Sequence, residues 1–202
     1  MMHAALRSFV FAFLLLAAPL AQAAGTATAT VERLNGALLA VMQEAEALGY
    51  QGRYDRLAPE LTEIFDFPAM ARVSLGSQWK KLEPPQQEAF TEAFADYSIA
   101  VFAARFDGFS GESFEVTGER EARRGNVVVL NQLVKSDGEI IAINYLARPD
   151  KEGGNWRLVD TFLDAKYSEM AARRSEYSGF VKRDGVEALI ATLNEKIAGY
   201  AK

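Results

Sequence analysis

The chain has 202 residues, of which 50% are hydrophobic and 24% are charged, as in a folded globular protein. It contains no cysteine, and its one histidine is His3. The chain therefore cannot form disulfides, thiolate metal sites or a Cys-His catalytic pair. After residue 3 it also has no histidine for a metal site or for Ser-His-Asp catalysis. The net charge of −5 argues against nucleic-acid binding, because neutralising phosphates requires a basic surface.

The first residues have the pattern of a secretory signal peptide. Arg7 precedes an apolar run from Phe9 to Ala18, and Ala21-Gln22-Ala23 has the small residues that signal peptidase accepts. The run is shorter than the roughly 20 residues that a membrane-spanning helix needs. We therefore expect residues 1–23 to be cleaved, residues 24–30 to form a disordered leader, and residues 31–202 to form one domain.

Four helices are predicted in the first half of the chain. Apolar residues recur at three- and four-residue intervals from Val31 to Leu48 and again from Tyr54 to Phe65. A short helix follows, with Asp66 as its cap and Gly76 as its end. The longest helix begins at the Pro84-Pro85 pair and continues to about Phe106.

The second half of the chain predicts four strands followed by two helices. The strands cover residues 113–120, 126–135, 139–148 and 155–164, separated by the turn signals Arg124-Gly125, Asp137-Gly138 and Gly153-Gly154. Helical periodicity returns at Tyr167 and again after Asp184-Gly185. The predicted class is therefore α+β, with a twisted four-stranded antiparallel sheet covered on one face by helices.

Two strands are apolar on both faces, namely Val127 to Leu130 and Ile140 to Ile143. An antiparallel sheet with one solvated face should alternate apolar and polar residues. Two interpretations remain open. Either helices cover the second face over a filled interior, or the sheet curls and, with the aromatic helix from Phe90 to Phe106, encloses a pocket for an apolar ligand.

Carboxylates are the catalytic side chains still to be considered. Those of Glu112, Glu115, Glu119 and Glu121 flank the first strand and fit a solvated surface. Asp160 differs, because the alternation of a strand predicts that it shares a face with Trp156, Leu158 and Phe162. A buried carboxylate needs a hydrogen-bonding partner, so Asp160 either accepts hydrogen bonds that stabilise the structure or is a functional group.

Three segments resemble the MlaC family, also called the toluene-tolerance auxiliary proteins. The first runs from Phe65-Asp66-Phe67-Pro68 through Met70-Ala71-Arg72 and Leu75-Gly76 to Trp79 and the Pro84-Pro85-Gln86 helix start. The second is Gly154-Asn155-Trp156-Arg157-Leu158-Val159-Asp160, and the third is the closing helix after Gly185. After the aspartate strand the chain departs from the usual pattern, and Arg173-Arg174-Ser175-Glu176 resembles the branch associated with hopanoid biosynthesis.

This resemblance implies an NTF2-like cone with an apolar cavity, in a periplasmic protein that shuttles a phospholipid or hopanoid between membrane complexes. The implied partners are an inner-membrane ABC-type lipid transport complex and an outer-membrane acceptor, in a system that maintains outer membrane lipid asymmetry. No cofactor, metal or catalytic residue is implied. The expected lipid-binding residues are Phe67, Met70, Val73, Phe94, Tyr97, Phe102, Val129, Ile141, Ile143, Tyr145, Trp156 and Leu158.

Three cations are candidate headgroup contacts, namely Arg72, Arg105 and Lys166. Two other functions remain open. One is a lipid-modifying enzyme, of isomerase or hydratase type, that uses Asp160. The other is a structural adaptor of an envelope transport complex.

Overall fold

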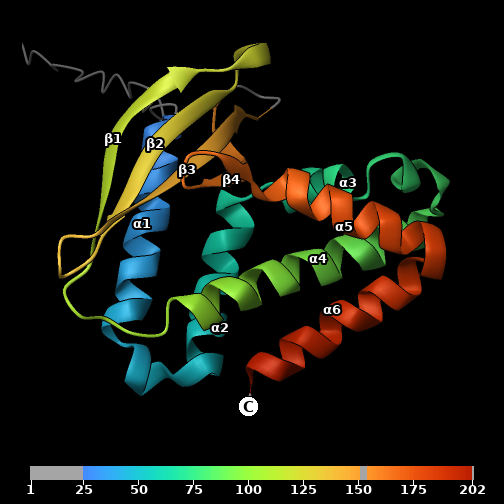
Figure 1. Ribbon diagram of the computed structural model, residues 1–202, viewed down its shortest axis with the longest axis horizontal. Coiled ribbons are helices and arrows are strands. Elements are labelled where there is room, and N and C mark those ends of the chain that lie inside the picture. The colour runs from blue at the N-terminus through green and yellow to red at the C-terminus, as the bar shows by residue number, and fades with distance from the viewer. Residues whose placement is uncertain (1–24, 151–153, 202) are drawn as a thin grey trace, which may run out of the picture.

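An antiparallel sheet forms one layer of the molecule, and α1, α2 and α4 all lie on the same side of it (Figure 1). The computed structural model describes residues 25–150 and 154–201. The predicted signal peptide, residue 24 and Gly153 of the predicted Gly153-Gly154 turn lie outside these ranges. The helices are α1 (Ala27–Gln43), α2 (Ala45–Ile64), α3 (Phe67–Leu75), α4 (Pro84–Arg105), α5 (Glu169–Asp184) and α6 (Val186–Tyr200).

The first helix begins earlier than its apolar periodicity suggests. Thr26 is the N-cap of α1, and its Oγ1 accepts a hydrogen bond from the backbone N–H of Ala29 at 3.0 Å. The prediction of a disordered leader is therefore wrong for residues 27–30, because a capping side chain satisfies an otherwise free N–H group of the first turn. Gly49, with φ of 58°, forms a kink inside α2 where the sequence predicts a helix end.

The next two helices begin as predicted. Asp66 Oδ1 accepts a hydrogen bond from the backbone N–H of Ala69 at 3.0 Å, and α3 ends at Gly76, which has φ of 56°. Pro84 opens α4, where Gln86 Oε1 accepts a hydrogen bond from the backbone N–H of Glu83 at 2.9 Å. The contact between Gln86 and Glu83 sets the start of α4, the long helix that lies beneath the sheet (Figure 1).

The sheet is a meander in the order β1-β2-β3-β4-β5, with every neighbouring pair antiparallel. Its strands are β1 (Ser113–Glu121), β2 (Val127–Val134), β3 (Ile140–Pro149), β4 (Trp156–Leu163) and β5 (Tyr167–Ser168). The sheet therefore has five strands and not the predicted four. Asp164 and Ala165, with φ of 50° and 55°, turn the chain back to form β5, which at two residues is too short to show alternation in the sequence.

An irregularity in β4 changes which way its side chains point. Leu158 pairs with Ala147, and Asp160 pairs with Leu146. Two successive residues of β3 thus pair with residues of β4 that have Val159 between them, so Val159 is an extra residue and forms a bulge. Leu146 and Ala147 are successive residues of β3 and face opposite sides of the sheet. Their partners Asp160 and Leu158 therefore also face opposite sides. The predicted common face of these two residues is therefore wrong, because a one-residue bulge breaks the alternation.

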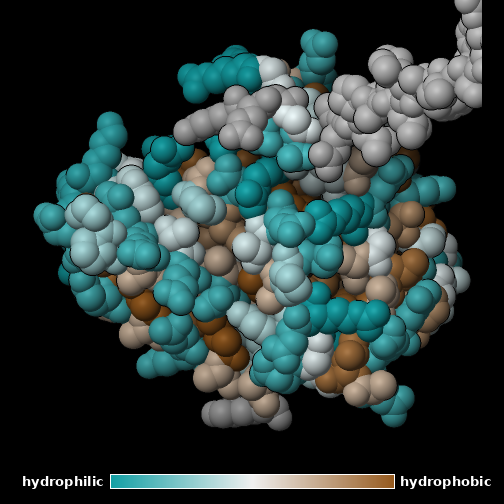
Figure 2. Space-filling model, turned by 180° about the vertical axis from the view of Figure 1, so that it is seen from behind, coloured by the Kyte–Doolittle hydropathy of each residue, from teal (hydrophilic) through white to brown (hydrophobic). Residues whose placement is uncertain are grey.

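The helices α1, α2 and α4 pack against the inner face of the sheet (Figure 1). Asn35 of α1 donates a hydrogen bond to Asn131 of β2 at 2.8 Å, and both side chains are buried. One apolar core runs from Ala27 to Leu193 in sequence. From behind, hydrophilic side chains cover most of the surface, with hydrophobic ones scattered among them (Figure 2). No helix in the described part of the chain is long and apolar enough to cross a membrane.

Candidate functional site

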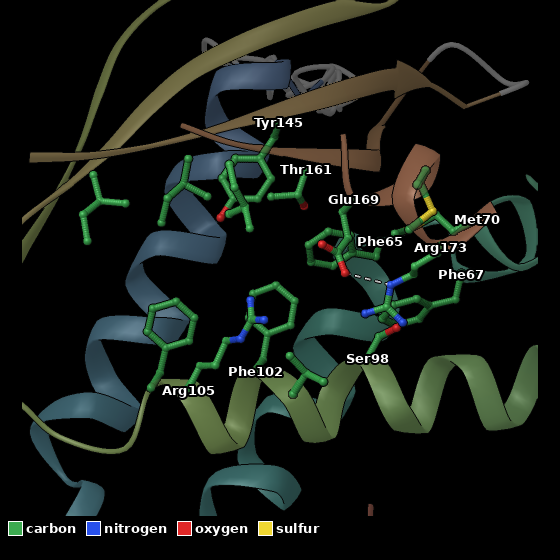
Figure 3. A pocket seen from close by; sticks show the side chains of 16 residues that line it. Phe65, Phe67, Met70, Ser98, Phe102, Arg105, Tyr145, Thr161, Glu169 and Arg173 are labelled. Carbon is green, nitrogen blue, oxygen red and sulfur yellow. Dashed lines mark hydrogen bonds and ion pairs between the residues drawn. The ribbon is translucent and has the colours of Figure 1, made fainter. Parts of the chain in front are cut away.

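A pocket of about 310 Å³ lies between the inner face of the sheet and α4 (Figure 3). This volume is at the lower end of the roughly 300–1,000 Å³ typical of small-molecule sites. Most lining side chains are aromatic or aliphatic, as expected for an apolar ligand. The lining consists of Phe65, Phe67, Met70, Ser98, Val101, Phe102, Arg105, Phe106, Ile141, Ile143, Tyr145, Thr161, Leu163, Glu169, Met170 and Arg173.

Six of the twelve expected lipid-binding residues lie in this lining. They come from α3, α4 and β3, and are Phe67, Met70, Phe102, Ile141, Ile143 and Tyr145. The resemblance and the strand pattern therefore lead to three of the elements that form the pocket. Because Ile141, Ile143 and Tyr145 are two residues apart on β3, one face of that strand forms part of the wall.

The other six expected residues lie elsewhere. Phe94, Val129 and Leu158 are completely buried in the core, while Tyr97 and Trp156 are partly buried and pack against it. Val73 is 45% exposed on α3. An apolar residue in the core and one in a pocket wall have the same sequence signature, so composition could not separate these positions.

The remaining lining residues include five apolar side chains that were not singled out as ligand contacts, namely Phe65, Val101, Phe106, Leu163 and Met170. A signal for part of the α4 wall was present in the sequence. Ser98, Val101, Phe102 and Arg105 follow at intervals of three, one and three residues, which places them on one side of a helix. Of the three candidate headgroup cations, Arg105 lines the pocket, whereas Arg72 and Lys166 do not.

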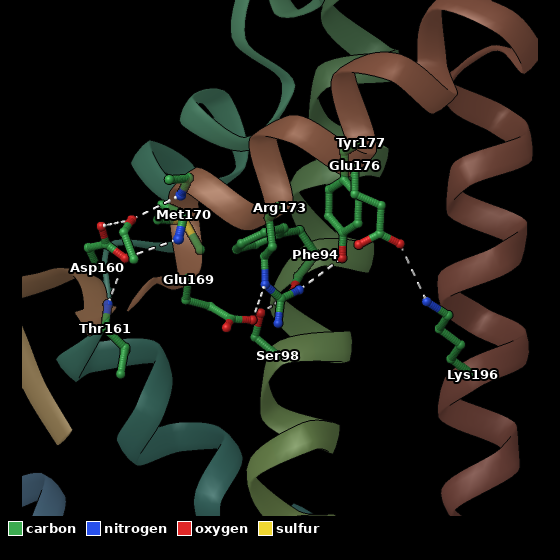
Figure 4. Close-up of polar contacts among 12 residues, drawn as sticks. Phe94, Ser98, Asp160, Thr161, Glu169, Met170, Arg173, Glu176, Tyr177 and Lys196 are labelled. Carbon is green, nitrogen blue, oxygen red and sulfur yellow. Dashed lines mark hydrogen bonds and ion pairs between the residues drawn. The ribbon is translucent and has the colours of Figure 1, made fainter. Parts of the chain in front are cut away.

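The polar part of the lining is centred on Arg173 of α5 (Figure 4). Its Nε donates a hydrogen bond to Glu169 Oε1 at 2.9 Å, and its Nη1 donates one to the Tyr177 hydroxyl at 2.9 Å. Its guanidinium carbon also lies 5.4 Å from the ring centre of Phe94 and 5.2 Å from that of Tyr97. These contacts fix the orientation of the guanidinium group.

Arg173 retains its positive charge in this setting. Burial by itself lowers the pKa of Arg173, but Tyr177, Glu169 and Tyr97 more than offset this, so the pKa is raised above its ordinary value. Burial also raises the pKa of Tyr145, which keeps that phenol neutral in the pocket wall. The pocket thus combines an apolar body with a partly buried ion pair between Arg173 and Glu169.

Asp160 has a structural role outside the pocket lining. Its carboxylate accepts hydrogen bonds from the Ser168 hydroxyl at 2.6 Å, from the Thr161 N–H at 2.8 Å and from the Met170 N–H at 3.0 Å (Figure 4). Burial raises the pKa of Asp160, although these hydrogen bonds oppose the shift. Since Ser168 is the N-cap of α5, Asp160 fastens the start of that helix to β4.

The acidic side chains do not gather into a metal site. Within residues 25–150 and 154–201, no three His, Cys, Asp or Glu side chains are grouped so that they could hold a metal ion. What the pocket offers a ligand is therefore an apolar enclosure with hydrogen-bonding groups from α4, the sheet and α5. This arrangement suits binding of an amphiphile.

The known proteins that are similar to this chain include phospholipid-binding proteins. The family model described as MlaC protein matches residues 32–195. The intermembrane phospholipid transport system binding protein MlaC of Haemophilus influenzae is 20% identical over 123 residues, which cover 60% of this chain and 57% of that protein. The chain thus aligns with little more than half the length of this curated relative.

A solved structure shows the same fold. It is that of the phospholipid-binding protein from Ralstonia solanacearum in complex with a phospholipid, with a TM-score of 0.75 and 21% sequence identity. The superposition covers 88% of this chain and 100% of that chain. Because the family model matches most of the sequence, from the first helix to the last, the chain belongs to the MlaC family.

Proposed function

We propose that this protein binds a phospholipid in the pocket between the sheet and α4 and transfers it between membranes. The observation that carries the proposal is the pocket itself, in which most of the sixteen lining residues are apolar. Burying each methylene group is worth about 0.8 kcal/mol, so a chain of about sixteen carbons costs on the order of 13 kcal/mol to bring into water unshielded. An enclosing pocket offsets much of this cost, and transfer then needs no catalytic residue.

The proposed location is the periplasm. It is supported by the signal-peptide pattern in residues 1–23 and by the name of the Haemophilus influenzae relative, a binding protein of an intermembrane phospholipid transport system. The proposed partners are an inner-membrane transport complex and an outer-membrane acceptor. The sequence predicts a domain over residues 31–202, and with the first turn of α1 included, residues 27–202 would act as one lipid-binding domain with an NTF2-like conical shape.

A hopanoid is the second candidate ligand. The Arg173-Arg174-Ser175-Glu176 segment resembles the hopanoid-associated branch, and Arg173 of this segment lies in the pocket wall. A polycyclic hopanoid and a two-chain phospholipid require different cavity shapes. Competition between the two for the purified protein therefore decides which lipid is the cargo.

The test of the main proposal is native mass spectrometry of the protein purified from a periplasm, followed by uptake of labelled phospholipid from vesicles. We expect a bound species with the mass of a phospholipid and saturable uptake by protein that has been stripped of lipid. A protein that carries no lipid when isolated and takes up neither phospholipid nor hopanoid would refute the proposal. Val101→Phe, which places a larger side chain in the pocket lining, should reduce uptake, and Val129→Phe in the core is its matched control.

A further inference from the structure

Arg173 has hydrogen-bond donors that the protein does not use. A guanidinium group has five N–H donors. Nε donates to Glu169 and Nη1 to Tyr177, whereas Nη2 has no acceptor among the residues that the structure describes. The residue is only 9% exposed and lines the pocket. Free donors of a buried group that borders a cavity are a recognition site for an oxygen atom of a ligand.

The position of this group is fixed before a ligand binds. Three aromatic rings, those of Phe94, Tyr97 and Tyr177, lie within 5.9 Å of the guanidinium carbon. In Figure 3 the guanidinium of Arg173 extends from α5 and lies beside Glu169 and Ser98 at one end of the pocket, while Arg105 extends from α4 toward Phe102. A group held by packing and hydrogen bonds loses little freedom when it binds a ligand.

The charge balance indicates which oxygen is bound. Glu169 lies 2.9 Å from Arg173 and neutralises its charge. A ligand phosphate or carboxylate placed against this pair would be repelled by Glu169, whereas a neutral acceptor would not. In a phospholipid whose chains fill an apolar pocket, the neutral acceptors attached to those chains are the ester carbonyl oxygens.

We propose that Nη2 of Arg173 donates a hydrogen bond to an acyl ester carbonyl of the bound lipid, so that the pocket distinguishes ester-linked from ether-linked chains. This rests on the proposed function. An ether oxygen is a weaker acceptor and is placed differently, so an ether lipid would leave Nη2 of Arg173 without an acceptor. Sites that hydrogen-bond a ligand group discriminate strongly against analogues that lack it.

The experiment compares two phospholipids that have the same headgroup and chain length and differ only in ester or ether linkage. Affinity is measured by uptake from vesicles of each lipid and by competition in native mass spectrometry. We expect the unmodified protein to prefer the ester lipid by about tenfold, the usual size of a hydrogen bond to a charged group. Arg173→Met should bind both lipids equally, while Arg174→Met, which changes the exposed neighbour on the same helix, should keep the preference.

Each outcome decides between the two proposals. If the unmodified protein binds neither lipid, the phospholipid-binding function itself fails. If it binds both equally, the carbonyl contact is wrong and the binding function stands. A preference that survives in a folded Arg173→Met variant also overturns the role of Arg173.

If Arg173→Met does not fold, Arg173→Lys takes its place. Lysine keeps the charge next to Glu169 but lacks the planar fork of donors. The ester preference should then fall to about twofold or less. A preference as large as that of the unmodified protein would overturn the inference.

Discussion

Two parts of the inner face of the sheet have similar apolar residues, yet one is filled and the other is hollow. On the filled side α1 packs on β2, and Leu34, Leu38 and Val129 are completely buried. On the hollow side, Ile143 and Leu163 border the pocket opposite α4. The strands do not determine this difference.

The helices opposite the strands account for the contrast. Leu34 and Leu38, one turn apart on α1, present branched side chains to the core. Around the pocket, α4 contributes the short side chains of Ser98 and Val101 between larger ones. The cavity lies where α4, and not α1, is opposite the strands. Five predictions test this comparison.

The largest effect is expected on the filled side. Leu38→Ala should lower the free energy of unfolding by about 2–5 kcal/mol, because it leaves a cavity in a closely packed core. Lipid uptake at a temperature where the variant is folded should be unchanged, since Leu38 does not line the pocket. Denaturant unfolding and vesicle uptake measure the two quantities, and a parallel loss of uptake would contradict the separation of the two sides.

The same substitution on the two sides should have opposite effects. Val129→Phe overfills the core and should cost about 1–3 kcal/mol of unfolding free energy with little change in uptake. Val101→Phe should change the unfolding free energy by less than about 1 kcal/mol, because the pocket has room for the ring, and should reduce uptake several-fold. Equal destabilisation by both variants would show that the pocket is not a cavity in solution.

The next largest effect on stability is expected at Asp160, which links the start of α5 to β4 beside the pocket. Asp160→Ala leaves the Ser168 hydroxyl and the Thr161 and Met170 N–H groups without their acceptor, and should cost about 1–2 kcal/mol. Denaturant unfolding measures this loss. Glu115→Ala, on the surface of β1, is the control and should change stability by less than about 0.5 kcal/mol.

The ionisation of Asp160 predicts a pH dependence. Its pKa in the folded protein is raised above the ordinary value of 3.8, so the folded state holds the proton more tightly than the unfolded state. This contribution to stability is complete below pH 3.8 and is lost as the pH rises through the folded pKa. The stability of the unmodified protein relative to Asp160→Asn should therefore increase as the solution is acidified from neutral pH. A difference that is constant with pH in denaturant unfolding would contradict the raised pKa.

The smallest effect is expected at the turn beside the pocket. Ala165 has φ of 55°, which costs an L-residue roughly 1–2 kcal/mol, and glycine removes this strain but loses more entropy on folding. Ala165→Gly should therefore gain less than about 1 kcal/mol in unfolding free energy. The matched control is Ala172→Gly, in the exposed face of α5, which should lose up to about 1 kcal/mol. A loss in both variants would contradict the left-handed conformation at Ala165.

Periodicity in the sequence was sufficient for the long helix α4 and the first four strands, because each has several turns or alternations. It misplaced the boundary between the first two helices, which lies at Glu44 and not at Gly49. It could not reveal β5, which has only Tyr167 and Ser168, nor the extra residue Val159 in β4. The start of α1 was missed because Thr26 acts through a capping hydrogen bond and not through apolar spacing.

The candidate site was predicted in part for a different reason. Ile141, Ile143 and Tyr145 follow from alternation on β3, but Phe94 and Val129 have the same apolar character and belong to the core. Arg173 was noticed only as part of a family segment. Its i,i+4 spacing from Glu169 is typical of solvent-exposed ion pairs. Only the packing of α5 against α3, α4 and the sheet buries the Arg173 side of this pair.

The bulge at Val159 also affects how sequences of this family should be aligned. If a homologue lacked this residue, its strand would alternate regularly from Leu158 to Asp160, and the same side chains would still face inward. A gap placed at Val159 therefore preserves the structural equivalence of Thr161 and Leu163, whereas a gap a few residues away would assign core positions to the opposite face. An alignment that ignores this point would pair inward-facing positions of one sequence with outward-facing positions of another.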